Sequence, residues 1–180
     1  MKRYSLIILS MLLLLTGCGS KSSFSTTFDE FTMKLYDNNK QYIGVPVDTS
    51  IVGLKVLTQM KEKTLVTDTG FINSFIIVKT NVQSGTNVKA LVESNTKKNQ
   101  LKLLKYVSID NLSKKVKCDG LQYSWYITAF SYQLTNEKLY EGQYFFTDDE
   151  SLYIVSLSSD DEKDINSFIK SAGTLTCIHI

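Results

Sequence analysis

The distribution of apolar residues predicts a chain built mainly of strands. Residues 71–82 are dense in β-branched and aromatic side chains, which suits a strand covered on both faces. Residues 121–130 alternate in the two-residue period of a strand, and residues 139–147 and 152–158 are two strands joined by Asp148-Asp149-Glu150, a hairpin signal. Weaker strands are expected at residues 28–36, 41–47, 51–59 and 101–109, the last leading to a turn at Ser113-Lys114-Lys115.

Two segments have the 3.6-residue period of amphipathic helices. The first begins near Thr86-Asn87, either of which can cap it, and continues to about residue 96 with Val88 and Val92 on one face. The second follows the capping-box sequence Ser159-Asp160-Asp161-Glu162 and has an apolar stripe that ends at a glycine: Ile165, Phe168, Ile169, Ala172 and Gly173. Strands with two separated helices predict an antiparallel sheet flanked by helices, an α+β or layered sandwich.

The N-terminus predicts export and attachment to lipid. Lys2 and Arg3 precede an apolar run of about ten residues, half of the roughly 20 that a membrane-spanning helix needs. Leu15-Thr16-Gly17-Cys18 resembles a bacterial lipobox. The resemblance implies that Cys18 is diacylated on its sulfur, that the chain is cut before it, and that its new amine is acylated, with palmitate among the acyl chains. We therefore expect a signal peptide over residues 1–17, a small and polar flexible tether over residues 18–27, and a lipid anchor on the extracytoplasmic side of the cell envelope. An uncleaved anchor and ordinary secretion are the alternatives.

Composition narrows the function classes. The 180 residues include 20 Lys and Arg and 18 Asp and Glu, so loss of Lys2 and Arg3 with the signal leaves 18 of each and no net charge. Arg3 is also the only arginine, so the mature chain has no guanidinium for bidentate recognition of phosphate. Nucleic acid is therefore not an expected partner. Residues 28–180 are enough for a single globular domain.

Cys118 and Cys177 form an even pair once Cys18 is assigned to lipid. Outside the cytoplasm such a pair can stay oxidised. A bridge would close a loop of about 60 residues, worth about 4 kcal/mol in the chain-entropy model. We expect a disulfide between Cys118 and Cys177, and two buried thiols are the alternative.

The order of elements over about residues 70–175 resembles the PsbP-like group. The strand Tyr140-Glu141-Gly142-Gln143-Tyr144-Phe145-Phe146, the paired strand at 152–157 and the helix with Ile165-Asn166-Ser167-Phe168 are similar to the tyrosine-rich strand, paired strand and serine–phenylalanine helix that end that group. The resemblance implies an α/β/α sandwich with a central antiparallel sheet of about six or seven strands. It also implies non-catalytic work, binding or stabilising a protein assembly at a membrane. Metal sites described in photosynthetic members use histidine, whereas this chain has a single histidine, His179, close to its last residue. We therefore carry over the fold and a generic binding role, and not a role in a photosystem.

The sequence lacks the usual catalytic motifs. It has one histidine, His179, and no G-x-S-x-G, H-E-x-x-H or C-x-x-C. His179 beside Cys177 does not make a zinc site, so we expect no catalytic residue, metal site or cofactor, and no enzyme. Asp148-Asp149-Glu150 has ligands for Ca²⁺, but a solvated hairpin turn is the favoured interpretation, as helix capping is for Asp160-Asp161-Glu162.

Two residue sets remain as candidates for contact with a partner. The first set is basic: Lys97, Lys98, Lys102, Lys105, Lys114, Lys115 and Lys117. The favoured interpretation is a helix end and a turn exposed to solvent, and the alternative is a surface that attracts an acidic partner or an anionic membrane. The other is aromatic, and cross-strand packing explains most of it, although some members can line a binding groove: Tyr123, Trp125, Tyr126, Phe130, Tyr132, Tyr140, Tyr144 and Phe145.

The sequence predicts a lipid-anchored, extracytoplasmic, non-catalytic binding or assembly module of a membrane-associated complex, with an envelope protein as partner. A module should show an exposed apolar or charged patch. A solute- or metal-binding receptor for a transporter is one alternative and should show a closed pocket with converging polar groups. An envelope hydrolase that uses carboxylates is another and should show two of them roughly 5–10 Å apart in a cleft.

Overall fold

The computed structural model describes residues 23–29, 31–36, 40–46, 54–63, 71–118, 121–148, 150–171, 174 and 176–177. Seven strands form the main sheet in the order β3-β4-β5-β9-β8-β7-β6, and each neighbouring pair is antiparallel. In chain order they are β3 (Tyr42–Gly44), β4 (Lys55–Glu62), β5 (Ser74–Asn81), β6 (Leu104–Cys118), β7 (Leu121–Leu134), β8 (Glu137–Thr147) and β9 (Ser151–Ser159). A smaller sheet has the order β1-β2-β10, with β1 (Ser23–Phe28), β2 (Phe31–Tyr36) and β10 (Thr176–Cys177).

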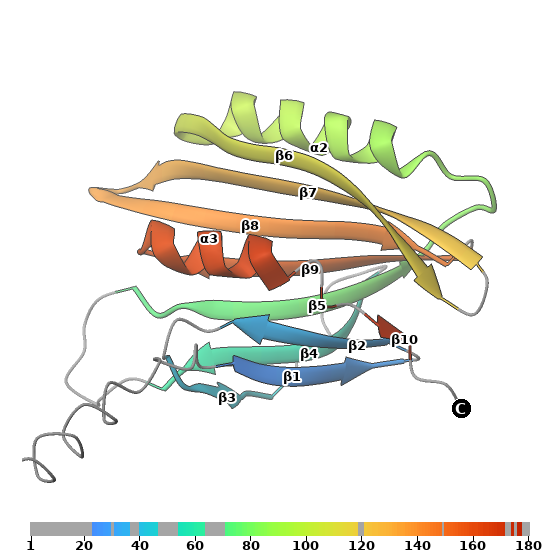
Figure 1. Ribbon diagram of the computed structural model, residues 1–180. Helices are drawn as coiled ribbons and strands as arrows, with labels where there is room; N and C mark the ends of the chain where they lie inside the picture. Colours follow the sequence, from blue (N-terminus) through green and yellow to red (C-terminus); the bar gives the residue numbers. More distant parts are fainter. Residues whose placement is uncertain are drawn as a thin grey trace, which may run out of the picture.

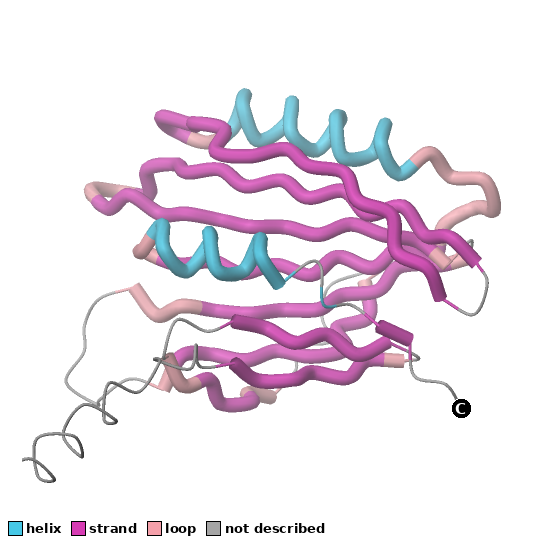
Figure 2. The backbone as a smooth tube through the Cα atoms, viewed as in Figure 1, coloured by secondary structure: helices cyan, strands magenta, loops and turns pink. Residues whose placement is uncertain are grey.

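The two helices cover opposite faces of the main sheet (Figures 1 and 2). Helix α3 (Glu162–Ser171) packs over Tyr144 and Phe146, together with the smaller sheet. Helix α2 (Val88–Lys102) packs over Phe145, the residue between them. Because successive side chains of a strand point to opposite faces, this alternation separates an α3 face from an α2 face.

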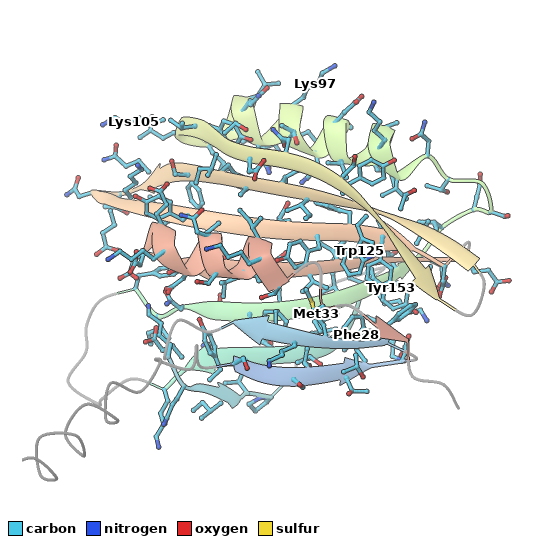
Figure 3. All side chains as sticks on the ribbon, viewed as in Figure 1. Phe28, Met33, Lys97, Lys105, Trp125 and Tyr153 are labelled. Carbon is cyan, nitrogen blue, oxygen red and sulfur yellow. The ribbon has the colours of Figure 1, made fainter. Side chains whose placement is uncertain are left out.

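The α3 face contains a continuous aromatic core. Phe146 stacks on Trp125 with ring centroids 4.4 Å apart and on Tyr153 at 4.7 Å. Phe31 of the smaller sheet meets Phe146 edge-on at 5.0 Å, and Phe28 lies 6.0 Å from Tyr153. Figure 3 shows Phe28 and Met33 of the smaller sheet close to Trp125 and Tyr153 of the main sheet. The smaller sheet therefore closes the part of the core that α3 leaves uncovered.

Helix α3 packs against β8 at a glycine. The Phe168 ring stacks on Tyr144 at 4.2 Å with an interplanar angle of 5° and meets Phe75 edge-on at 6.4 Å. A Cβ atom at Gly142 would lie 2.6 Å from Cδ1 of Phe168. Gly142 is therefore needed for the close approach of α3, because any side chain there would displace the Phe168 ring.

The predicted fold class is confirmed as α+β, with helices on both faces of a seven-stranded antiparallel sheet. The β8–β9 hairpin is confirmed, and so is the first helix, whose N-cap Asn87 accepts a hydrogen bond from the Ala90 N–H at 3.1 Å. The last helix is confirmed with a shifted cap, since Asp161 Oδ1 accepts from the Lys163 N–H at 2.9 Å while Ser159 lies inside the fold.

The predicted boundary between tether and domain is wrong. We expected a flexible tether over residues 18–27, but residues 23–27 belong to β1, which pairs with β2 from Ser23↔Tyr36 to Phe28↔Phe31. We also expected one strand over residues 28–36, whereas the chain reverses at Asp29, with φ +46°. The Asp29 carboxylate accepts hydrogen bonds from Lys79 at 2.7 Å and Tyr153 at 2.9 Å, which holds this turn in place.

Two predictions in the middle of the chain are also wrong. Helix α2 runs through Lys102 rather than ending near residue 96, because residues 97–102 are mostly good helix formers. The strand expected over residues 101–109 therefore starts at Leu104 and continues to Cys118. The expected turn at Ser113-Lys114-Lys115 lies within it, paired with Tyr126, Trp125 and Ser124. Lysines are common on edge strands, where they discourage pairing with other chains.

Replacing Gly142 with alanine should destabilise the domain by about 1–3 kcal/mol, the usual cost of overpacking a filled core. Thermal melting of Gly142→Ala should show this loss. Gly44→Ala is the matched control, because a Cβ there would meet nothing within 4 Å. Equal melting temperatures for the two variants would contradict the proposed seating of Phe168.

Candidate functional site

A groove of about 590 Å³ lies on the α2 face, between α2 and strands β6 and β7. One wall is a stripe of α2, and the other wall and floor come from the two strands. The lining residues are Lys89, Val92, Glu93, Thr96, Lys97 and Gln100 of α2, Asn111 and Ser113 of β6, and Tyr126 and Ile127 of β7. Most of these side chains are polar or charged, so the groove offers hydrogen-bond donors and acceptors beside one aromatic ring.

The groove exists because α2 is attached to the sheet by few apolar residues. Only Val88 and Val92 of its 15 residues are buried hydrophobics. They pack on Phe145 and Leu152, with Tyr126 partly buried beside them. Later turns of the helix have polar residues where a packed helix would have leucines. The side of α2 that faces β6 therefore remains open to solvent.

A chain of amides fixes the middle of α2. Asn95 Nδ2 donates to Gln143 Oε1 at 3.2 Å, and Gln143 Nε2 donates to Glu141 Oε1 at 2.6 Å. Burial raises the pKa of Glu141 above its ordinary value of 4.5, and the hydrogen bond from Gln143 opposes that shift only in part. The chain therefore depends on a carboxylate whose charged form is poorly solvated.

Exposed apolar side chains gather where α2 ends and β6 begins. Leu101 is 87% exposed, Leu104 61%, Val107 56% and Leu134 55%. Leu104 and Val107 pair with Gln133 and Ser131, so they lie next to the end of β7 that carries Leu134. We call these four residues, with Lys98, Lys102 and Lys105, the tip. Figure 3 shows Lys97 and Lys105 projecting outward from α2 and from the start of β6.

The backbone of the tip is irregular. Lys105 has φ +52°, and Thr135 in the β7–β8 turn has φ +55°. The register of β6 against β7 shifts between Leu104 and Val107 and again between Ser108 and Asp110. Such bulges bend an edge strand and re-aim its side chains. The Tyr106 ring stacks on Phe130 at 5.1 Å and fixes this bent segment to the sheet.

The acidic clusters singled out in the sequence serve structural roles. Asp148 Oδ1 accepts from the backbone N–H groups of Ser151 at 2.8 Å and Glu150 at 3.3 Å, so it caps the hairpin turn. Outside these clusters, Asp164 and Glu62 both pair with Lys40. The Lys40 Nζ lies 2.7 Å from Asp164 Oδ2 and 3.4 Å from Glu62 Oε2. Asp164 is buried and also accepts from Asn73 and Ser159, which ties α3 to the sheet.

Several predicted site residues lie outside the part that the structure describes. Cys18 and His179 are outside the described residues. Cys118 and Cys177 end strands β6 and β10, which contact each other, but the side chains of both cysteines are outside the description. The lipid on Cys18 and the Cys118–Cys177 bridge therefore stay predictions. Lys114, Lys115 and Lys117 are placed in β6 by backbone only.

The aromatic set divides between the two faces. Trp125, Tyr144 and Phe145 are buried, as cross-strand packing predicts. Tyr126 is the member that lines the groove. Sequence reasoning missed Gln100, Asn111 and Ser113, since polar residues on a helix or an edge strand have the same pattern whether they face solvent or a groove.

The described residues contain neither a cluster of metal ligands nor a helix that could span a membrane. No group of three or more His, Cys, Asp or Glu side chains within the described ranges is placed to hold a metal ion. No helix in the described part of the chain is both long and apolar enough to cross a bilayer.

Comparison with known proteins identifies the fold. No family model matches the chain, and no curated protein matches it. The solution structure of cyanobacterial PsbP (CyanoP) from Synechocystis superposes with a TM-score of 0.55 at 14% identity, covering 89% of this chain and 95% of that one. The fold is PsbP-like.

Two further solved structures resemble this PsbP-like chain. LpqN, involved in cell envelope biogenesis of Mycobacterium tuberculosis, has a TM-score of 0.48 at 9% identity and covers 81% of this chain and 95% of its own. PA94 from Pseudomonas aeruginosa, of unknown function, has a TM-score of 0.46 at 11% identity, with coverages of 84% and 91%.

Replacing Glu141 with glutamine should stabilise the domain at neutral pH. A raised carboxyl pKa means that folding disfavours the charged form, so the cost is present at neutral pH and disappears below 4.5. Glutamine keeps the acceptor for Gln143 without the charge. We expect the melting temperature at pH 7 to rise by roughly 2–4 °C, the shift from about 1 kcal/mol in a domain of this size.

The gain from Glu141→Gln should shrink as the pH falls below 4.5. Glu137→Gln, at an exposed position of the same strand, is the control and should change little at any pH. A lower melting temperature for Glu141→Gln at pH 7 would show that the charge at residue 141 supports the fold.

Proposed function

We propose that this chain is a lipid-anchored extracytoplasmic binding module, non-catalytic, that holds a segment of an envelope protein in the groove between α2 and β6. The N-terminal sequence supports export and acylation at Cys18. The PsbP-like fold, one sheet with a helix on each face, supports a domain built around a core rather than around a catalytic cleft. The groove is the observation that carries the proposal.

The shape of the groove suits an extended polypeptide. Its α2 wall runs from Lys89 to Gln100, which is about 16 Å along a helix that rises 1.5 Å per residue. Its other wall is β6, the last strand in the order of the main sheet. An edge strand offers backbone N–H and C=O groups to a partner strand, and adjacent side chains give specificity. The groove therefore offers a lined wall beside an edge strand.

The polar chemistry of the groove favours this module over a small-solute receptor. Lys89, Glu93 and Gln100 are exposed, so the groove is open along its helical wall rather than closed around a ligand. The groove does not favour a hydrolase that uses two carboxylates either. Within the described lining, Glu93 is the one carboxylate. Glu62 and Asp164 do lie close together, but both pair with Lys40, and none of these three residues lines the groove.

A charge reversal in the groove should weaken capture of the partner. The native lipoprotein, purified from detergent-solubilised membranes, should co-purify with an envelope protein. Lys97→Glu should reduce the recovered partner roughly tenfold, as expected when an interface loses about 1.4 kcal/mol. Lys163→Glu is the control, since it makes the same charge change at an exposed position of α3, on the opposite face of the sheet and outside the groove lining.

Equal recovery with Lys97→Glu and wild type, at unchanged melting temperature, would reject the groove as the binding site. Loss of partner with Lys163→Glu but not with Lys97→Glu would place the binding surface on the α3 face.

A further inference from the structure

The tip has the composition of a membrane-contacting surface. Leu101, Leu104, Val107 and Leu134 are all more than half exposed. Exposed apolar residues gathered in one place and rimmed by polar ones mark an interaction site. The segment from residue 94 to 109 contains four lysines and no Asp or Glu, and Glu137 is the carboxylate of the adjoining β7–β8 turn. Apolar side chains that project beside lysines suit an anionic lipid surface.

The start of the domain lies at the same end of the molecule as the tip. Asp29 follows β1 directly and binds Lys79 and Tyr153, near the β8–β9 turn. The tip lies at the opposite end of the strands, beside the β7–β8 turn. Strand β1 runs from Ser23 toward Asp29, so its first residue is at the end of β1 that is nearer the tip end; the direction of β1 can be followed in Figure 1.

The short connection to Cys18 limits how far this end can be from the membrane. Five residue steps separate Cys18 from Ser23. At 3.3–3.6 Å per residue the connection spans at most about 18 Å. An acylated Cys18 sits at the level of the lipid headgroups, so the start of β1 is held near the bilayer, and the domain can turn the tip end of its strands toward the lipid.

Carboxylates and lysines are mixed at the end far from the tip. That end carries Asp29, Asp148 and Glu150, and also Lys55, Lys79 and the lysines at residues 114, 115 and 117 of β6. The acidic start of α3, at Asp161 and Glu162, is at the tip end but on the α3 face, whereas the tip extends from α2 and the edge strand β6 (Figure 1). The tip is therefore set apart by exposed apolar side chains beside its lysines, and not by charge alone.

We infer that the tip rests on the anionic phospholipid surface in which the protein's own acyl anchor is embedded. This inference rests on the lipid anchor of the proposed function. An acyl anchor at Cys18 attaches the chain to the bilayer without fixing how the domain is turned, and apolar and basic contacts at the tip orient it. With the tip on the membrane, α2 and the groove beside it are held at a fixed height above the lipid.

Amide hydrogen exchange of the purified full-length lipoprotein tests this contact. The protein is reconstituted in vesicles of phosphatidylcholine alone and in vesicles that also contain phosphatidylglycerol. With phosphatidylglycerol, exchange over residues 98–107 and 131–138 should slow roughly tenfold, because contact suppresses local opening. Exchange around Asp29 and Glu150 should be the same in both vesicles.

Variants separate the tip from general lipid contact. Leu104→Glu should abolish the slowing without changing the melting temperature. Leu91→Glu makes the same change at an exposed position near the start of α2, at the end far from the tip, and should leave the slowing intact. Equal protection with Leu104→Glu and with wild type would overturn the inference.

The remaining outcomes distinguish the inference from the proposed function. The mass of the purified chain shows whether Cys18 carries lipid. A lipidated chain whose tip exchanges equally fast in both vesicles overturns the membrane contact and leaves the anchor standing. An unmodified Cys18 overturns the anchor, and the membrane contact with it. Protection on native membranes but not on protein-free vesicles would assign the tip to a protein partner and overturn the lipid contact.

Discussion

The contact between Phe168 and β8 determines which surfaces of this domain are available for binding. Phe168 lies over Gly142 and stacks on Tyr144 at 4.2 Å, and the same ring meets Phe75 of β5. This contact brings α3 against the sheet, and the smaller sheet covers the rest of that face through Phe28 and Phe31. The α3 face is therefore filled, and a ligand would have to displace core aromatics to enter it. Binding is left to the α2 face and the strand edges.

The same contact explains what could be predicted from sequence. The residues that resemble the PsbP-like group, Tyr144 on its strand and Phe168 on its helix, are the ones that pack α3 on the sheet. Because these residues encode packing, they predicted the α+β sandwich and said little about function. The hairpin at Asp148 and the cap at Asn87 were predictable because each is a local interaction within a few residues.

The errors fall where distant contacts decide local structure. Ser23–Phe28 is polar enough to read as a tether, but it becomes strand β1 by pairing with β2 and by the anchoring of Asp29 to Lys79 and Tyr153. The groove was invisible to periodicity, since Lys89, Glu93, Lys97 and Gln100 have the pattern of a solvated helix face. That one side of this helix face is directed toward β6 is seen only from the position of α2 over Phe145 in the folded domain.

Stability therefore comes from the packing of the α3 face, and we propose that binding belongs to the α2 face. Photo-crosslinking in living cells tests that division most directly, with a photoreactive amino acid at Gln100 in the groove or at Asn166, an exposed position of α3. The account predicts an adduct with an envelope protein from Gln100 and none from Asn166. An adduct from Asn166 with none from Gln100 would contradict it.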